Sequence, residues 1–367
     1  MAAQSGIRDL RQLPKAHLHI HLEGAMRRST LEELADRYGI ERPPDTRNQR
    51  FDNFMGFNAT YVAATQCIRT PDDLARLIAE VSEDAAGHGA WWHEPAFDGA
   101  RYSSERAGSP YQIFETQQEC WRFGLEAAEA AEKATGVGVA FVAAADRTQP
   151  VERAIERAEV VSELAISGRH MIRSGMECFD GEHSGIASFG LHANEEGHPP
   201  EPFAEAFRVA TAGTGLLSTP HAGEIAPFAG GGPASVEGAV DALGADRIQH
   251  GVLSIEDPQL VARLAAEQVC LDVCPSSNLL LKVFGSVQQH PLPALLEAGV
   301  PCSLASDDPL LFGPSLLDEY ELCRREMGLS DEQLAAVARA SFEFSAAPRP
   351  VKDAGIAAIE GWLSSGG

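Results

Sequence analysis

Residues 247–274, RIQHGVLSIEDPQLVARLAAEQVCLDVC, contain the unit on which the fold prediction rests. The unit opens with a short strand that ends at His250 and continues with a predicted helix over residues 257–267. It closes with an apolar strand over residues 269–274. A helix between two strands allows both strands to run in the same direction, so this order favours a parallel sheet.

The same alternation of strand and helix continues on both sides of this unit. Strands are predicted near residues 17, 90, 137, 185, 215, 247, 269 and 300, with helical stretches between them. Eight strand–helix units predict an α/β fold, namely a distorted TIM (β/α)8 barrel with a helical insertion after the first strand.

The chain is predicted to form a single domain over residues 1–367, because no linker rich in Pro, Gly or Ser divides it. Residues from about 40 to 86 are predicted to form a helical lid within that domain. The lid region carries an aromatic stripe of Phe51, Phe54, Phe57 and Tyr61. A stripe of this kind more often packs in a core than contacts a ligand.

Composition excludes several classes of function. The net charge of -24 argues against a nucleic-acid partner, since phosphate contacts require a basic face. No apolar run is long enough to span a bilayer, and the N-terminus lacks a charged-then-apolar leader, so no membrane partner is expected. Seven cysteines without framework spacing indicate a reducing compartment, and we expect a cytoplasmic protein. Its oligomeric state cannot be predicted from these features.

Three separated segments offer ligands that suit one divalent metal: His19-Ile20-His21, His221-Ala222-Gly223-Glu224 and Ser306-Asp307-Asp308-Pro309. On a strand, residues two apart point to the same face, so both imidazoles of the first segment can meet one ion. We assign His19, His21, His221 and Asp307 as the metal ligands, with one position left for water. Imidazole and carboxylate suit Zn²⁺, although iron, manganese and cobalt are also compatible with these residue types.

The segments also carry candidate acid and base groups for metal-assisted hydrolysis. Glu224 would donate or shuttle a proton if a dry pocket raised the pKa of its carboxyl group. His250 would orient or deprotonate the metal-bound water, and Asp308 would face the substrate. Each has a structural alternative: His250 as a core residue at a strand end, Asp308 as a helix N-cap, and Glu224 as a cap or salt-bridge partner. His17 shares the strand face, and we interpret it as a second-layer residue because three ligands from one strand would crowd the ion.

At this point the chain resembles the adenosine deaminase family of zinc-dependent aminohydrolases. The resemblance runs from about residue 13 to about residue 348 and is carried by motifs that occur in the family's order. They are Leu13-Pro14-Lys15, His19-Ile20-His21-Leu22-Glu23-Gly24, Pro220-His221-Ala222-Gly223-Glu224, Arg247-Ile248-Gln249-His250-Gly251, Cys274-Pro275-Ser276-Ser277-Asn278 and Ser306-Asp307-Asp308-Pro309. The family pattern implies the same barrel and a site of three His and one Asp.

The resemblance also implies roles for single residues. Glu224 would protonate the purine ring nitrogen beside the reacting carbon, and His250 would assist the attacking water. Asp308 would hydrogen-bond the five-membered ring. The remaining substrate contacts that the resemblance implies come from His21, Glu23 and the backbone near Ala193. The other class of zinc deaminases uses an H-x-E and P-C-x-x-C pattern, which this chain lacks.

The expected function is hydrolytic deamination of a 6-aminopurine nucleoside, adenosine or deoxyadenosine, to inosine or deoxyinosine and ammonia. Three departures from the family pattern leave other substrates open: His17 in place of Glu, Glu23 in place of the Asp that meets ribose, and the segment FGLHANEE at residues 189–196. The alternatives are adenine and a modified adenosine such as aminodeoxyfutalosine. Alternatives of another class are a non-deaminase amidohydrolase and a catalytically silent purine-binding protein.

Overall fold

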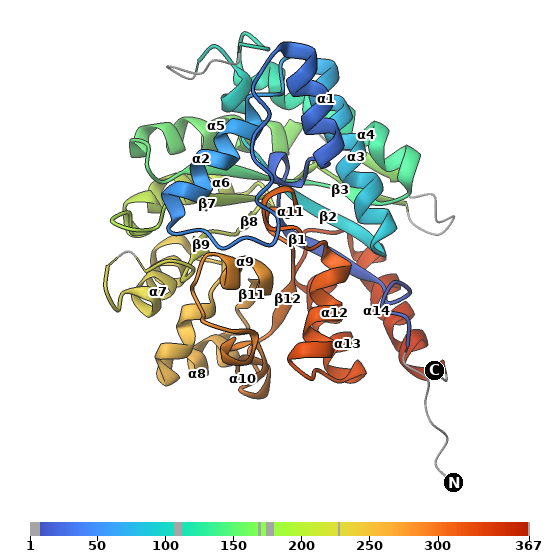
Figure 1. Ribbon diagram of the computed structural model, residues 1–367, viewed down its shortest axis with the longest axis vertical. Coiled ribbons are helices and arrows are strands. Elements are labelled where there is room, and N and C mark those ends of the chain that lie inside the picture. Colours follow the sequence, from blue (N-terminus) through green and yellow to red (C-terminus); the bar gives the residue numbers. More distant parts are fainter. Residues whose placement is uncertain (1–7, 106–111, 168–169, 174–179, 227, 366–367) are drawn as a thin grey trace.

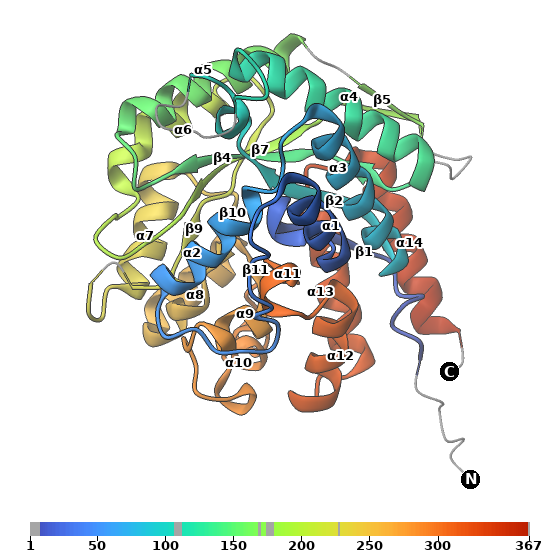
Figure 2. The same ribbon diagram turned by 45° about the horizontal axis from the view of Figure 1, so that its top comes forward.

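The protein is represented by a computed structural model that describes residues 8–105, 112–167, 170–173, 180–226 and 228–365 (Figure 1). Its helices lie outside a central set of strands, as the two views of Figures 1 and 2 show. The helices are α1 (Arg28–Tyr38), α2 (Phe54–Thr65), α3 (Pro71–Gly87), α4 (Gln117–Thr135), α5 (Val151–Ser167), α6 (Ala204–Thr211), α7 (Gly232–Leu243), α8 (Pro258–Glu267), α9 (Pro275–Leu280), α10 (Leu292–Glu297), α11 (Pro309–Phe312), α12 (Leu316–Glu326), α13 (Asp331–Glu343) and α14 (Arg349–Ser364).

The central strands form two parallel sheets that together make the wall of a barrel. The first sheet has the order β1 (Lys15–His21), β2 (Ala90–Phe97), β4 (Phe141–Asp146), β7 (Ile186–His192) and β8 (Leu217–Ser218), with the short β3 (Gly138–Val139) on β2. The second has the order β12 (Cys302–Leu304), β11 (Cys270–Val273), β10 (Arg247–His250) and β9 (His221–Ala222). Every pairing in these two sheets is parallel.

Two junctions close these sheets into a ring. At the first, β8 and β9 are successive parts of one strand, interrupted at Pro220, which has no N–H to give to a sheet ladder. At the second, a parallel bridge joins Ile20 to Asp307. There His21 N donates to Asp307 O over 3.0 Å, and Asp307 N donates to His19 O over 3.2 Å. The predicted α/β barrel is therefore confirmed, with a strand, or two successive short strands, at each predicted position.

Local sequence explains where the helices begin. Thr70 precedes α3, and its hydroxyl accepts from Asp73 N over 3.2 Å while the Asp73 carboxylate accepts from Thr70 N over 3.0 Å. This reciprocal capping box satisfies donors that have no partner inside the helix. Pro71 in the first turn lacks the N–H that would otherwise need a partner there.

A polar layer lies inside the barrel. The guanidinium of Arg247 donates to Glu94 over 2.7 Å and to Asp272 over 2.8 Å, and all three side chains are excluded from solvent. Trp92 Nε1 also donates to Glu94, over 2.8 Å. Because buried charges are tolerated only when paired, this layer joins β2, β10 and β11 at fixed positions.

Details of the strands differ from the sequence prediction. The third predicted strand is divided into β3 and β4 at Ala140, whose amide donates to His93 O over 3.2 Å. An antiparallel hairpin, β5 (His170–Arg173) and β6 (Asp180–His183), was not predicted. His183 of this hairpin was expected on the surface, but its Nε2 lies 3.0 Å from Glu132 Oε1.

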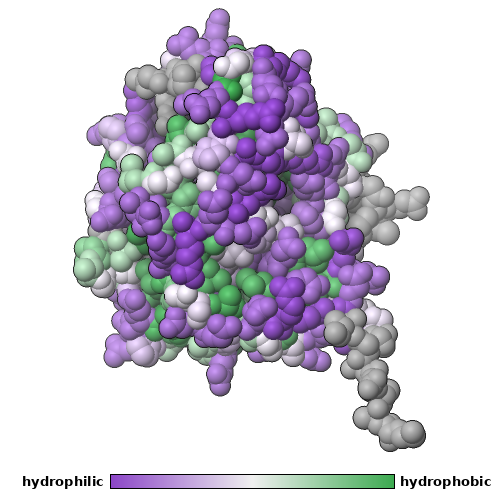
Figure 3. All heavy atoms as spheres, viewed as in Figure 1, coloured by the Kyte–Doolittle hydropathy of each residue, from purple (hydrophilic) through white to green (hydrophobic). Residues whose placement is uncertain are grey.

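The surface is consistent with the acidic composition. Hydrophilic residues cover much of the face shown in Figure 3, with hydrophobic patches between them. Within the described ranges, no helix combines the length and the apolar character that crossing a membrane requires. The cysteines at positions 67, 120, 270, 274, 302 and 323 are all buried free thiols.

Candidate active site

The predicted site residues meet at the end of the barrel where the parallel strands finish. His19 and His21 belong to β1, His221 begins β9, His250 ends β10, and Asp307 follows β12. His21, His221, His250 and Asp307 line a cavity of about 510 Å³, and His19 lies next to them. Its lining includes the residues predicted to contact substrate, namely His21, Glu23, Ala193, Glu224, His250 and Asp308. Barrel enzymes place their active sites at this end.

Imidazole and carboxylate groups converge in the floor of the cavity. One ligand atom from each of His19, His221, His250 and Asp307 lies within 4.8 Å of the others. His21 approaches the same carboxylate, with its Nε2 3.2 Å from Asp307 Oδ1. His21 also forms a second such group with His192 and His221. The predicted ligands are therefore brought together, and His250 lies as close to the cluster as they do.

The donor atoms fit a cation. His19 Nδ1 lies 3.1 Å from the carbonyl oxygen of Asp272 and donates to it, which leaves the lone pair of Nε2 directed at Asp307. His19 Nε2, His221 Nδ1 and His250 Nε2 are buried without a hydrogen-bond partner in the part of the chain that the structure describes. Buried polar atoms are seldom left unpaired, so a divalent metal is the ligand that this donor set suits.

Strained backbone holds two members of the cluster. His250 has a φ of 68° and Asp307 a φ of 59°, both in the left-handed region that residues with a side chain seldom adopt. Such conformations cost about 1–3 kcal/mol each and occur mostly at functional sites. At Asp307 the bridge to β1 supplies the compensating hydrogen bonds.

Glu224 stands beside the cluster in a dry environment. Its Oε1 lies 3.4 Å from His250 Nε2. Burial, with the nearby charges of Asp307 and Glu195, raises the pKa of the Glu224 carboxyl well above its usual range. The raised pKa favours the protonated carboxyl group, which is the form that a general acid requires.

Asp307 and Asp308 behave differently although they are adjacent. Burial alone would raise the pKa of Asp307, but the imidazoles of His19 and His21 beside it hold that pKa well below its usual range. Burial and the charge of Asp307 raise the pKa of Asp308. Asp308 precedes α11, yet its side chain makes no capping hydrogen bond, so it remains directed at the cavity. Gly24 makes room for it, because a Cβ at Gly24 would lie 1.6 Å from Asp308 Oδ1.

Glu23 is held by aromatic hydroxyls that the sequence analysis did not identify. Tyr102 Oη donates to Glu23 Oε1 over 2.6 Å, and Tyr61 Oη donates to Glu23 Oε2 over 2.9 Å. Tyr61 belongs to α2, whose aromatic stripe serves two purposes. Phe57 stacks on Phe312 with ring centroids 5.1 Å apart, while Phe54 and Tyr61 also line the cavity.

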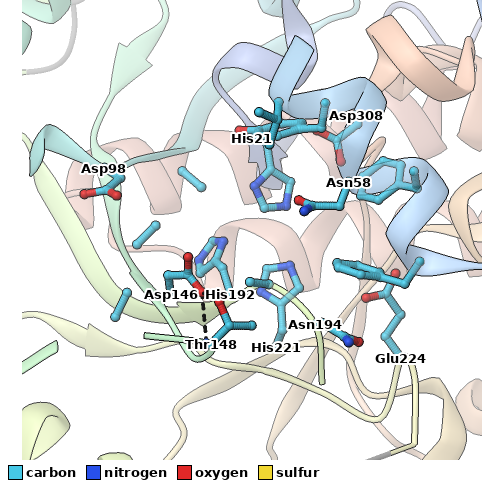
Figure 4. Close-up of a pocket in the computed structure, with 18 of the residues that line it drawn as sticks. His21, Asn58, Asp98, Asp146, Thr148, His192, Asn194, His221, Glu224 and Asp308 are labelled. Carbon is cyan, nitrogen blue, oxygen red and sulfur yellow. Dashed lines mark hydrogen bonds between the residues drawn. The ribbon is translucent and has the colours of Figure 1, made fainter. Parts of the chain in front are cut away.

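His192 lies in the 189–196 segment that departs from the family pattern, where it was expected to contact a different substituent of the substrate. It ends β7, and its ring centroid lies 4.3 Å from that of His221. Gly190 makes room for this imidazole, since a Cβ there would lie 2.5 Å from His192 Nε2. Figure 4 shows His192 between Glu224 on one side of the cavity and the carboxylates of Asp98 and Asp146 on the other.

Two supporting contacts lie behind the cluster. His17 Nε2 accepts from Ser306 N over 3.2 Å, so the interpretation of His17 as a second-layer residue is confirmed. Asn278 bridges His250 and His290, with Nδ2 3.4 Å from His250 Nδ1 and Oδ1 3.1 Å from His290 Nε2. His290 was expected on the surface but is buried. Its position after a loop gave no periodic signal that could have revealed this contact.

Comparisons with known proteins agree with this geometry. The sequence model of one family, adenosine deaminase, matches residues 14–362. A putative adenosine/adenine deaminase of Streptomyces coelicolor is 38% identical over 97% of this chain and 98% of its own length. The structure of an adenine deaminase from Arthrobacter aurescens is 28% identical, with a TM-score of 0.80 over 96% of this chain and 99% of that one. An amidohydrolase from Burkholderia ambifaria with bound zinc is 25% identical, with a TM-score of 0.77 over 98% and 95%.

Proposed function

Because the chain belongs to the adenosine deaminase family, we propose that it hydrolyses the exocyclic amine of a 6-aminopurine nucleoside. Adenosine and deoxyadenosine are the default substrates, and inosine or deoxyinosine and ammonia are the products. The observation that carries this proposal is the position of Glu224, a buried acid with a raised pKa, 3.4 Å from His250 and facing the same cavity as the His–Asp cluster.

We propose zinc as the metal, held by His19, His21, His221 and Asp307. A zinc ion bound to these residues supplies Lewis-acid activation of water. The donor set of neutral imidazoles and one carboxylate supports this choice, as does the zinc in the Burkholderia relative. Iron, manganese and cobalt remain compatible with the same donors.

The acid and base groups of the chain then divide the proton transfers. Glu224 holds a proton and donates it to the purine ring nitrogen beside the reacting carbon. His250 Nε2, which lies 3.9 Å from Asp307 Oδ2 and 3.4 Å from Glu224 Oε1, is placed to orient the water and accept its proton. Asp308, whose pKa is raised by burial, hydrogen-bonds the five-membered ring of the purine.

The shape of the cavity supports a nucleoside over a free base. Glu224 and Asp308 lie on one side of the imidazoles in Figure 4, while Asp98, Asp146 and Thr148 lie on the other. This second region offers hydrogen-bonding groups to hydroxyls attached to the purine. Adenine is the second candidate, because both Glu23 carboxylate oxygens already accept from tyrosine hydroxyls. The relative from Arthrobacter aurescens, an adenine deaminase, points to the same candidate.

We also propose that residues 40–86 act as a lid within a single domain over residues 1–367. Helix α2 supports this role because its residues Phe54, Phe57 and Tyr61 line the cavity. Met55 and Val62 also line it and remain exposed, so their apolar surface is available to a substrate.

The test is ammonia release by zinc-loaded protein with adenosine, deoxyadenosine, adenine, aminodeoxyfutalosine and cytidine. A chelated sample is the control for each compound. Metal-dependent turnover of adenosine or deoxyadenosine supports the proposal, and turnover of adenine alone replaces it with the second candidate. Release of ammonia from none of the aminopurines, with zinc bound, contradicts it.

A further inference from the structure

The loop after β9 is built around the carboxylate of Glu195, which is 2% exposed. Glu195 Oε1 accepts from Gly223 N over 2.7 Å and from the hydroxyl of Ser235. Glu195 Oε2 accepts from Glu224 N over 3.1 Å and from Ile225 N over 2.8 Å. Three successive backbone amides thus converge on one side chain, in the concave arrangement that binds anions in many proteins.

The other end of the same segment is held by Arg147. Its guanidinium donates to the carbonyl oxygen of His221 and, over 3.4 Å, to that of Leu191. Between these two anchors Gly223 has a φ of 65°, and a Cβ there would lie 2.5 Å from Val236 Cγ2. The turn therefore has one conformation, fixed by a carboxylate at one end and a guanidinium at the other.

We propose that Glu195 is a positioning residue for the general acid. The segment that it binds carries the ligand His221 at its start and the acid Glu224 three residues later. By accepting hydrogen bonds from the amides of residues 223–225, Glu195 sets the distance and direction from the metal position to the Glu224 carboxyl. Glu195 itself is absent from the described lining of the cavity, so it acts through Glu224 and does not contact substrate.

The proposal depends on a carboxylate at position 195 and not merely on a side chain of its size. Each oxygen of Glu195 accepts two hydrogen bonds. In Glu195→Gln one oxygen becomes an NH₂ group, which cannot accept and would face an N–H or O–H donor. A buried donor left without an acceptor is destabilising, so the turn must rearrange locally.

This inference rests on the proposed function, and its experiment compares Glu195→Gln with the matched control Glu196→Gln. Glu196 is the exposed next residue, so its variant removes the same charge without touching the turn. For Glu195→Gln we expect kcat to fall about 100-fold, because misplacing a catalytic group by about 1 Å costs that much. We expect the KM to change by less than about threefold and the zinc content to stay at the wild-type value, as positioning of an acid alone requires.

A second measurement does not require turnover. Hydrogen exchange of the peptide containing residues 223–225 should be faster in Glu195→Gln than in the wild type and in Glu196→Gln, while the other barrel strands keep their protection. A wild-type kcat for Glu195→Gln, loss of its zinc, or unchanged exchange at residues 223–225 would overturn the proposal. A wild-type protein that deaminates no aminopurine would instead refute the proposed function, and the exchange experiment would still decide whether Glu195 orders the turn.

Discussion

His21 Nε2 lies 3.2 Å from Asp307 Oδ1, although the two residues stand near opposite ends of the chain. Asp307 is therefore the carboxylate that the imidazoles of β1 share. In Asp307→Ala we expect bound zinc, measured by elemental analysis after dialysis, to fall at least tenfold because the only predicted carboxylate ligand is gone. Asp308→Asn is the matched control and should retain its zinc. Full occupancy in Asp307→Ala would mean that the ligand assignment is wrong.

Glu224→Gln should separate catalysis from metal binding. The amide keeps the shape of the side chain but has no acidic proton, so kcat should fall by about 10²–10⁴ while zinc content remains at the wild-type value. Steady-state kinetics with the best substrate of the panel, together with elemental analysis, test this. Turnover near the wild-type rate would remove Glu224 from the role of general acid.

Gly24→Ala should displace Asp308 without replacing any residue of the proposed site. The added methyl would lie 1.6 Å from Asp308 Oδ1, so that carboxyl must move. We expect kcat/KM to fall more than about tenfold, from misplacement of a substrate contact, with zinc retained. Gly361→Ala in α14 is the control, since nothing lies within 4 Å of its added Cβ. Equal kinetics for the two variants would show that Asp308 does not need its present position.

Stability should depend on pH through Glu319. Burial raises the pKa of its carboxyl from 4.5 to about 8. Between these values the unfolded chain has lost this proton while the folded chain keeps it, so the free energy of unfolding falls as pH rises, by at most about 1.4 kcal/mol per pH unit. The stabilising contribution of Glu319 is complete at pH values below the pKa that its carboxyl has in the unfolded chain. At pH values above the pKa in the folded chain, this contribution changes no further.

Glu319→Gln removes this titration and keeps a side chain of similar size. Urea unfolding at pH 5 and pH 7.5 should show a smaller loss of stability in the variant than in the wild type. The exposed Glu326→Gln, at the end of the same helix, serves as the control. If the wild type and Glu319→Gln lose stability equally over this interval, Glu319 is not the responsible group.

Most of the barrel could be predicted because its strands are short, apolar and separated by helices with recognisable starts, as at Thr70 and Asp257. The division of the third strand at Ala140 could not be predicted, because a backbone amide that donates to the neighbouring strand leaves no mark on the sequence of an apolar run. The hairpin of β5 and β6 lacks the alternation that identifies a strand.

The residues of the candidate site could be proposed from the sequence because their types and spacing are chemically distinctive. The residues that hold this site in place could not be predicted. The roles of Arg147, Glu195 and Tyr61 depend on loops and helices that only the folded chain brings to the cavity. A buried glutamate that gathers backbone amides resembles any surface glutamate in a linear sequence. Such contacts become visible only in three dimensions.

The bridge between Ile20 and Asp307 closes the barrel where its first and last strands meet. This closure is also part of the candidate active site. During synthesis His19 and His21 emerge from the ribosome early, whereas the carboxylate of Asp307 emerges almost 290 residues later. A nascent chain stopped before β12 therefore has imidazoles but neither a closed ring nor an acidic ligand. The metal site that we propose can therefore form only after Asp307 has been synthesised, and a zinc ion captured earlier would have to be held by His alone.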